Sequence, residues 1–184
     1  AMARCLDFAG DPEALFHALF AAAAWSQLHF DRDWDLRSDV KVSDNVGWLD
    51  FTHALTFGNA VHRICRRHPH LWPQALLQLA CFVGRNQPYV KAAQDVTTWR
   101  VTDAAGFFET QGRGLFDHGQ PEFIVSAHLV KVWTAAREEY LAAPEAPWAE
   151  DLLAAVKRFM STPLKRKHAV RAARQSLAFV ALEG

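Results

Sequence analysis

The chain has 184 residues, which is the length of one ordinary domain. Hydrophobic residues make up 51% and charged residues 22%, which excludes an intrinsically disordered chain. The formal net charge is zero, so no overall charge favours nucleic acid or an anionic membrane surface. No apolar run approaches the roughly 20 residues that span a bilayer, which excludes a transmembrane helix.

The three cysteines, Cys5, Cys65 and Cys81, have no paired spacing. An odd number without a pattern argues against a disulfide framework and predicts a reducing, cytoplasmic compartment. The first residues lack the basic stretch and apolar run of a signal peptide. We interpret residues 1–3 as a cloning scar around the start methionine, and we treat 1–184 as a single helical domain.

The first predicted helix begins after Asp11 and ends near Leu28. Aspartate suits the position that caps a helix, Pro12 suits the first turn, and Glu13 is favoured near the positive end of the helix dipole. Apolar residues then recur at helical spacing, from Leu15 onward. The segment therefore predicts an amphipathic helix with a well-defined start.

An acidic segment follows, with aspartates alternating from position 31. The alternation resembles the start of a calcium-binding loop, but Leu36 stands where such a loop needs glycine. Val42 also stands where the bidentate glutamate belongs. We therefore predict a solvated loop or a short pair of strands, which is the only strand candidate in the chain.

Five further helices are predicted from helical spacing of apolar residues and from the prolines and glycines that interrupt it. Their ranges are 48–67, 74–83, 122–142, 148–160 and 163–182, with shorter candidates at 89–96 and 101–109. The helix at 74–83 is apolar almost all round, so we expect it to be central and buried. Six or seven helices with short connections predict an all-α, single-domain bundle.

Two histidines lie on otherwise apolar helix faces. His53 shares a face with Asp50, and His128 is three residues before Lys131. Ionisable side chains on such faces are costly unless they have partners, and burial lowers the pKa of histidine and lysine. If the two helices pack together, these four residues converge as a candidate catalytic group. The four residues would then line a pocket between the two helices. One end of that pocket would be closed by Asp117 and His118, which come just before the helix predicted at 122–142.

Several chemistries suit such a group. His53 and His128 are candidate metal ligands, and histidine with carboxylate is the ligand set of non-haem iron sites. A haem would need one or both histidines, and an organic cofactor or acid–base chemistry would also suit the pocket. The competing interpretation is that each histidine is a hydrogen-bonded core residue and that Lys131 extends to solvent. No Glu-x-x-His repeat of di-iron bundles occurs.

The carboxyl-terminal region is basic, while the first fifty residues are acidic. A basic helix of this kind is typical of a solvated face, and too few aromatic residues flank it for stacking of nucleic acid bases. Nucleic acid is therefore not the expected partner. The basic residues considered are Lys157, Arg158, Lys165, Arg166, Lys167, Arg171 and Arg174.

Two segments, Asp50–Val61 and Ile124–Lys131, resemble helical segments of bacterial proteins that accompany or extend Rieske-type iron–sulfur domains. They resemble more loosely the questin-oxidase-like helical proteins. The chain lacks the paired Cys and His motifs that ligate a Rieske cluster. The resemblance therefore implies an association with redox chemistry, and His53 and His128 are the positions that carry it.

Two functions follow as hypotheses. The first is a helical domain with an internal pocket around His53 and His128 that binds a metal or redox cofactor, with iron and haem as the candidates, for oxidoreductase chemistry. The alternative is a non-catalytic interaction module that docks onto a redox protein or larger enzyme, or forms a homo-oligomer. Tryptophans expected to be exposed, namely Trp34, Trp99 and Trp148, would anchor such an interface.

Overall fold

Eight α-helices make up most of the described chain, which contains no β-strand. The computed structural model describes residues 10–37, 46–119, 123–162 and 168–183. The helices are α2 (Pro12–Leu28), α3 (Arg32–Leu36), α4 (Trp48–Arg67), α5 (Trp72–Asn86), α6 (Ala104–Gly114), α7 (Phe123–Ala142), α8 (Ala149–Ser161) and α9 (His168–Glu183). Short 3-10 turns are η2 (Pro69–Leu71), η3 (Gln87–Tyr89) and η4 (Thr97–Trp99). The predicted all-α, single-domain bundle is confirmed.

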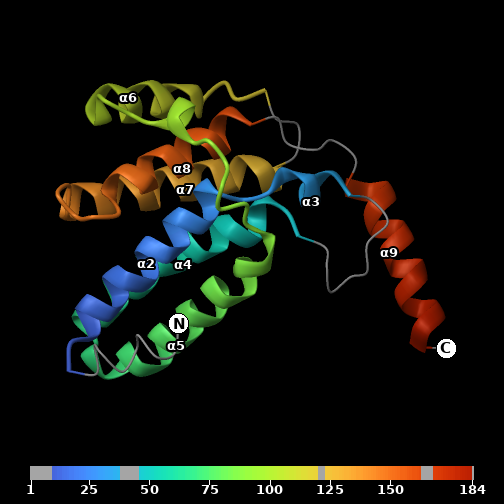
Figure 1. The fold of residues 1–184 in the computed structure, drawn as a ribbon, viewed down its shortest axis with the longest axis horizontal. Helices are drawn as coiled ribbons and strands as arrows, with labels where there is room; N and C mark the ends of the chain where they lie inside the picture. The colour runs from blue at the N-terminus through green and yellow to red at the C-terminus, as the bar shows by residue number, and fades with distance from the viewer. Residues whose placement is uncertain (1–9, 38–45, 120–122, 163–167, 184) are drawn as a thin grey trace.

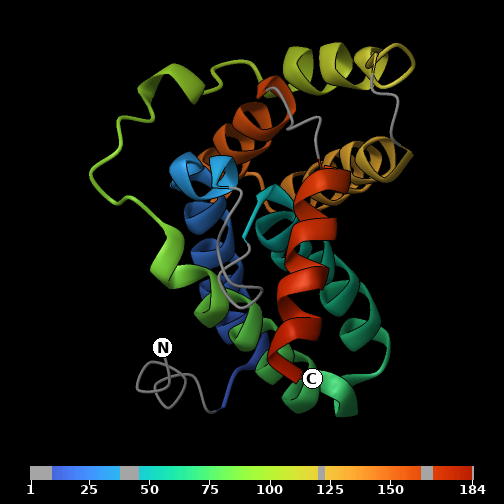
Figure 2. The same cartoon turned by 90° about the vertical axis from the view of Figure 1, so that its right-hand side faces the viewer.

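Helices α2 and α4 form the centre of the bundle (Figure 1). They pack against each other, with α5 on one side and with α7 and α8 on the other. Helix α6 packs against α7 at the outside of the bundle (Figure 2). One continuous apolar core joins these elements, since every helix from α2 to α8 except the short α3 contributes buried side chains to it. The helix α4 therefore has neighbours on three sides, which buries much of its length.

The start of α2 follows directly from its sequence. The Asp11 carboxylate accepts hydrogen bonds from the backbone N–H groups of Glu13 and Ala14, at 3.0 and 2.9 Å. These bonds satisfy amide groups that have no partner inside the helix. One turn further on, Phe16 and Phe20 are fully buried and stack on each other, with ring centres 5.3 Å apart. The predicted cap and the predicted apolar face are both confirmed.

Gly58 permits the close approach of α2 and α4. A Cβ atom at this position would lie 2.8 Å from the Cδ2 atom of Phe20. The Phe20 ring is fully buried and has no room to move aside. A glycine inside a helix is intrinsically unfavourable, so the packing of the two helices explains why this residue is present.

A buried arginine ties α8 to the chain that leaves α2. Arg158 donates hydrogen bonds from its guanidinium to the carbonyl oxygens of Leu28 and Phe30, at 2.6 and 2.8 Å. It also lies over the Trp48 ring and reaches the Gln94 side chain. Burial, and next the charge of Arg32, lowers the pKa of Arg158 to about 10. The group therefore stays protonated at neutral pH and faces the negative end of α2.

Three sequence predictions about single elements are wrong, and the first concerns residues 89–96, where the 3-10 turn η3 ends at Tyr89 and no helix follows. The described part of the acidic segment, residues 31–37, forms the short helix α3 rather than a loop or strand pair, because Asp31 caps it by accepting a hydrogen bond from the Asp33 N–H at 3.1 Å. The rest of the segment, residues 38–45, lies outside the described residues. Helix α5 is not buried all round, since Leu77 is 68% exposed and Cys81 is also exposed. Only the face that includes Leu76, Leu79 and Val83 is buried, because α2 and α4 cover α5 from one side.

Other expectations about exposure are also corrected. Trp148 is 2% exposed, and its indole N–H donates to His17 Nδ1 at 3.1 Å, so it is a core residue rather than an interface anchor. Trp34 and Trp99 are partly buried. Arg158 belongs to the core and not to a solvated basic face. Residues 1–3 and the expected starts of the helices at 122–142 and 163–182 lie outside the described residues.

Helix α9 stands to one side of the bundle in Figure 1, and in Figure 2, where that side faces the viewer, it lies in front of the other helices. It has no extensive packing contact with another described helix. Its carboxyl-terminal half exposes Leu177, Phe179, Val180 and Leu182. Within the described ranges, every helix is too short or too polar to cross a membrane.

Two glycine-to-alanine variants test the role of the α2–α4 contact. Gly58→Ala is expected to lower the free energy of unfolding by about 1–2 kcal/mol, because overpacking against Phe20 outweighs the gain in helix propensity. Gly84→Ala in α5 is the matched control, since its Cβ would meet open space. It should raise stability by about 0.5–1 kcal/mol. Urea unfolding of both variants checks this, and equal effects would contradict the packing argument.

Removing the Arg158 guanidinium should destabilise the fold strongly. Arg158→Met keeps the aliphatic stem but leaves the buried carbonyls of Leu28 and Phe30 without a donor. The expected loss is about 3 kcal/mol or more. Arg113→Ala, at an exposed position on α6, should stay within about 0.5 kcal/mol of the parent. Thermal unfolding measures both, and an Arg158→Met variant as stable as the parent would refute the argument.

Candidate functional site

Two groups of polar side chains are held between the helices. The first, the histidine pair, consists of His53 on α4 and His128 on α7, with Lys131 beside them. The second, the His62 cluster, consists of Glu13, Asn59, His62 and Glu139 from α2, α4 and α7. The sequence predicted the first group as a candidate site and did not predict the second.

The histidine pair is a direct contact between α4 and α7. The Nε2 atoms of His53 and His128 lie 3.0 Å apart, and the two rings meet edge to face. Lys131 Nζ lies 3.4 Å from His128 Nε2. His128 is 2% exposed, His53 is partly buried and Lys131 is exposed. Three nitrogen-bearing side chains that the sequence separates by up to 78 positions thus meet at one point.

The backbone fixes the proton position on His128. Its Nδ1 atom lies 2.7 Å from the carbonyl oxygen of Ile124, one turn earlier in α7. A carbonyl can only accept, so Nδ1 carries the proton and the neutral ring has its lone pair on Nε2. This lone pair points at both His53 and Lys131. The hydrogen bond between the two rings needs one hydrogen, and His53 can supply it from Nε2. A neutral His53 ring is therefore sufficient for this contact.

The surroundings of His53 favour its neutral form. Burial lowers the pKa of His53, and the nearby His128 and Lys131 lower it further, while Asp50 acts in the opposite direction. The Asp50 carboxylate itself accepts a hydrogen bond from the Gly47 N–H at 2.9 Å. Asp50 therefore caps the first turn of α4 and influences His53 through its charge. Of the four predicted residues, the structure brings three into contact and gives Asp50 a capping role.

Asp117 and His118 do not close the histidine pair. Asp117 is exposed. His118 lines a separate cavity of about 200 Å³ between α6, α7 and α8, together with Leu129 and Met160. The prediction that these two residues close a pocket at the histidine pair is therefore wrong, since His118 lines a different cavity.

The histidine pair offers two imidazole ligands to a metal ion. No group of three or more His, Cys, Asp or Glu side chains in the described parts of the chain is arranged to hold one. Imidazole suits zinc, copper, iron and nickel alike, so the donor type alone does not select the metal. The Nδ1–H bond to Ile124 is the kind of second contact that orients a metal-binding histidine.

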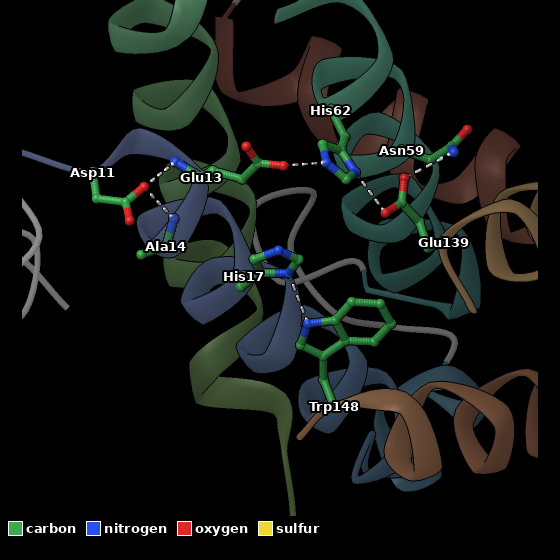
Figure 3. Close-up of polar contacts among 8 residues, drawn as sticks. All are labelled: Asp11, Glu13, Ala14, His17, Asn59, His62, Glu139 and Trp148. Carbon is green, nitrogen blue, oxygen red and sulfur yellow. Dashed lines mark hydrogen bonds and ion pairs between the residues drawn. The ribbon is translucent and has the colours of Figure 1, made fainter. Parts of the chain in front are cut away.

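The His62 cluster links three helices through one imidazole (Figure 3). His62 Nδ1 donates to a Glu139 carboxylate oxygen at 2.7 Å, and Nε2 lies 3.4 Å from Glu13 Oε1. Asn59 donates to the other Glu139 oxygen at 3.0 Å. His62 and Glu139 are 5% and 2% exposed. Because both ring nitrogens face carboxylate oxygens, this histidine is arranged as a cation.

The two neighbouring histidines of α2 and α4 have opposite protonation preferences. Burial by itself lowers the pKa of His62, but the hydrogen bonds and charges of Glu139 and Glu13 outweigh it and raise the pKa above its ordinary value. Burial and the charge of His62 lower the pKa of His17. The Trp148 N–H donates to His17 Nδ1, which must therefore hold a lone pair (Figure 3).

A sequence signal for the His62 cluster exists. On α4, His62 continues the buried stripe of Phe51 and Leu55, and on α7, Glu139 continues the stripe of Val132 and Ala136. Each is an ionisable residue on an apolar face, which was the criterion that selected His53 and His128. The spacing of the two stripes does not reveal which residues meet across the interface, so the pairing itself needs the structure.

The chain matches no family model, and no curated protein or solved structure is significantly similar to it. The resemblance to Rieske-associated and questin-oxidase-like helical segments therefore remains a prediction.

The charged state of His62 gives stability a specific pH dependence. Because its pKa is raised on folding, the contribution of His62 is fully present below the unfolded pKa of about 6.5. That contribution is lost as the pH rises through the higher folded value. The difference in unfolding free energy between the parent and His62→Gln should therefore be largest below pH 6.5 and shrink as the pH rises above it. Urea titrations measure it, with the exposed His70→Gln as control, and a constant difference would contradict the charged pair.

Proposed function

We propose that the histidine pair is the functional centre of this chain and that it binds a transition-metal ion for redox chemistry of the oxidoreductase type. The observation that carries the proposal is the convergence of two imidazole Nε2 atoms, 3.0 Å apart, on neighbouring helices. Burying polar rings in such an arrangement is costly, and perturbed ionisable groups concentrate at functional sites.

The separation of the two nitrogens suits a shared ion. Metal–imidazole bonds of about 2.0–2.1 Å that meet at roughly a right angle give nitrogens about 3 Å apart. Two rings on opposite faces of a haem iron would instead lie about 4 Å apart. The pair therefore supports a non-haem ion, including iron, better than a haem held by both histidines. When bound, such an ion would supply one-electron chemistry or polarise a bound oxygen atom.

Each residue around the proposed ion would have its own role. His53 and His128 would hold the ion through Nε2, and Ile124 would keep the His128 ring in the required tautomer. Lys131 is exposed beside the pair, where its ammonium would attract an anionic substrate group and would turn toward solvent when the ion binds. The remaining coordination positions would be open to water or substrate.

A second candidate function is the interaction module. The observation that favours it is α9, a helix that stands to one side of the bundle in Figure 1 and exposes several large apolar side chains. Exposed apolar surface of this kind is typical of a protein–protein contact. A redox protein partner or a second copy of the chain would suit it, and a cytoplasmic location remains the prediction from the cysteines.

Metal titration of untagged protein tests the proposed function. The parent should bind about one equivalent of Co²⁺ or Fe²⁺, and His53→Ala and His128→Ala should each weaken binding about a hundredfold, as loss of a ligand or of its support does. Absorption of the cobalt complex and elemental analysis give the readouts. His70→Ala, at an exposed position in η2, is the matched control.

Two outcomes would decide against this function. If the parent binds no metal, the pair is better explained as an acid–base group or as a hydrogen-bonded core contact. If the parent binds metal but both histidine variants bind it equally well, the ion lies elsewhere in the chain. Circular dichroism of each variant separates loss of the site from loss of the fold.

A further inference from the structure

The last turns of α4 and α7 enclose a cleft of about 490 Å³ that is separate from the histidine pair. The floor of the cleft includes part of the His62 cluster, and arginines of α4 form its rim. The lining residues are Asn59, His62, Arg63, Arg66, Arg67, Glu138, Glu139 and Ala142. An adjoining hollow of about 360 Å³ shares Asn59, Arg63 and Arg67 with it, so the two form one groove.

The acidic groups of this cleft already have partners. Both oxygens of Glu138 accept hydrogen bonds from Arg63 Nη1, at 2.9 and 3.0 Å. Glu139 accepts from His62 and Asn59 and is almost completely buried. A cationic ligand would have to displace these contacts, which are charge-assisted and therefore strong.

Two positive charges remain available at the rim. Arg66 and Arg67 are exposed and form no ion pair with any residue in the described part of the chain. As last-turn residues of α4 they offset the negative end of the helix dipole. That partial charge is smaller than the two guanidinium charges, so the rim stays positive.

We propose that this cleft binds a small anionic molecule whose carboxylate or phosphate oxygens are held by Arg66 and Arg67 and whose remaining atoms reach His62 at the floor. The guanidinium group pairs with such oxyanions through two parallel hydrogen bonds. A surface arginine pair alone has no rigid, buried surface behind it. Here the floor of the cleft supplies one, because His62, Asn59 and Glu139 are at least nine-tenths buried and are held by hydrogen bonds to one another.

The cleft is independent of the proposed metal site. His53 and His62 are nine positions apart on α4, which corresponds to about 14 Å along a helix. The two also have different partners, since His53 contacts His128 while His62 contacts Glu139 and Glu13. A variant that loses metal binding at the histidine pair can therefore still be tested for anion binding in the cleft, and the reverse also holds.

Imidazole nitrogen NMR of the full chain tests the proposal, with inorganic phosphate and succinate as separate probes at constant ionic strength. At least one of the two should shift the His62 resonances in a saturable way and leave those of His70 unchanged. Arg66→Ala combined with Arg67→Ala should weaken that binding about tenfold or more. Arg100→Ala combined with Arg113→Ala removes the same charge at distant exposed positions and should leave it unchanged.

The outcomes assign or reject the ligand. A response to phosphate alone supports a phosphate-bearing ligand, and a response to succinate alone supports a carboxylate ligand. No saturable shift with either probe would overturn the proposal, as would equal weakening by the control pair. If only an acidic peptide such as oligoglutamate binds, the groove is a protein-docking surface and the small-molecule proposal is wrong.

Discussion

The buried Arg158 guanidinium is the interaction on which the arrangement of the bundle depends. It joins α8 to the carbonyl groups at the end of α2, where a helix has acceptors without donors. The direct contacts of this charge are the oriented carbonyls and the Trp48 ring, and the Asp31 charge also favours its protonated form. With α8 fixed in this way, α7 is held between α8 and α4. The histidine pair and the His62 cluster both lie on that α4–α7 boundary.

Helix α4 gives the chain two chemically different environments. At its beginning, His53 meets another imidazole and a lysine, and these neighbours favour a neutral ring. Near its end, His62 lies between two carboxylates, which favour a protonated ring. The same side chain on the same helix therefore offers lone pairs in one place and positive charge in the other. The difference comes from the partners that α2 and α7 supply rather than from the local sequence of α4.

Local features of the chain made much of the fold predictable. The cap at Asp11, the prolines and the apolar spacing predict most helices, because each depends on neighbours a few residues away. The contact of His53 and His128 also follows a sequence rule, that ionisable groups on apolar faces need partners. The same rule applied to His62 and Glu139 would have indicated the second cluster, but not which residues pair. The burial of Trp148 and Arg158 was not predictable, because their partners are more than 125 positions away.

The two contacts between α4 and α7 constrain chain length as well as residue type. His53 meets His128 and His62 meets Glu139, so the helices run in the same direction and are aligned at two points. His53 and His62 are nine positions apart on α4. Their partners on α7, His128 and Glu139, are eleven positions apart. One residue inserted within either interval would rotate the following turn by about 100° and separate at least one contact. Insertions and deletions are thus disfavoured in these two intervals, whereas Pro144 and Glu145, in the turn between α7 and α8, are exposed and offer a place where the chain length can change.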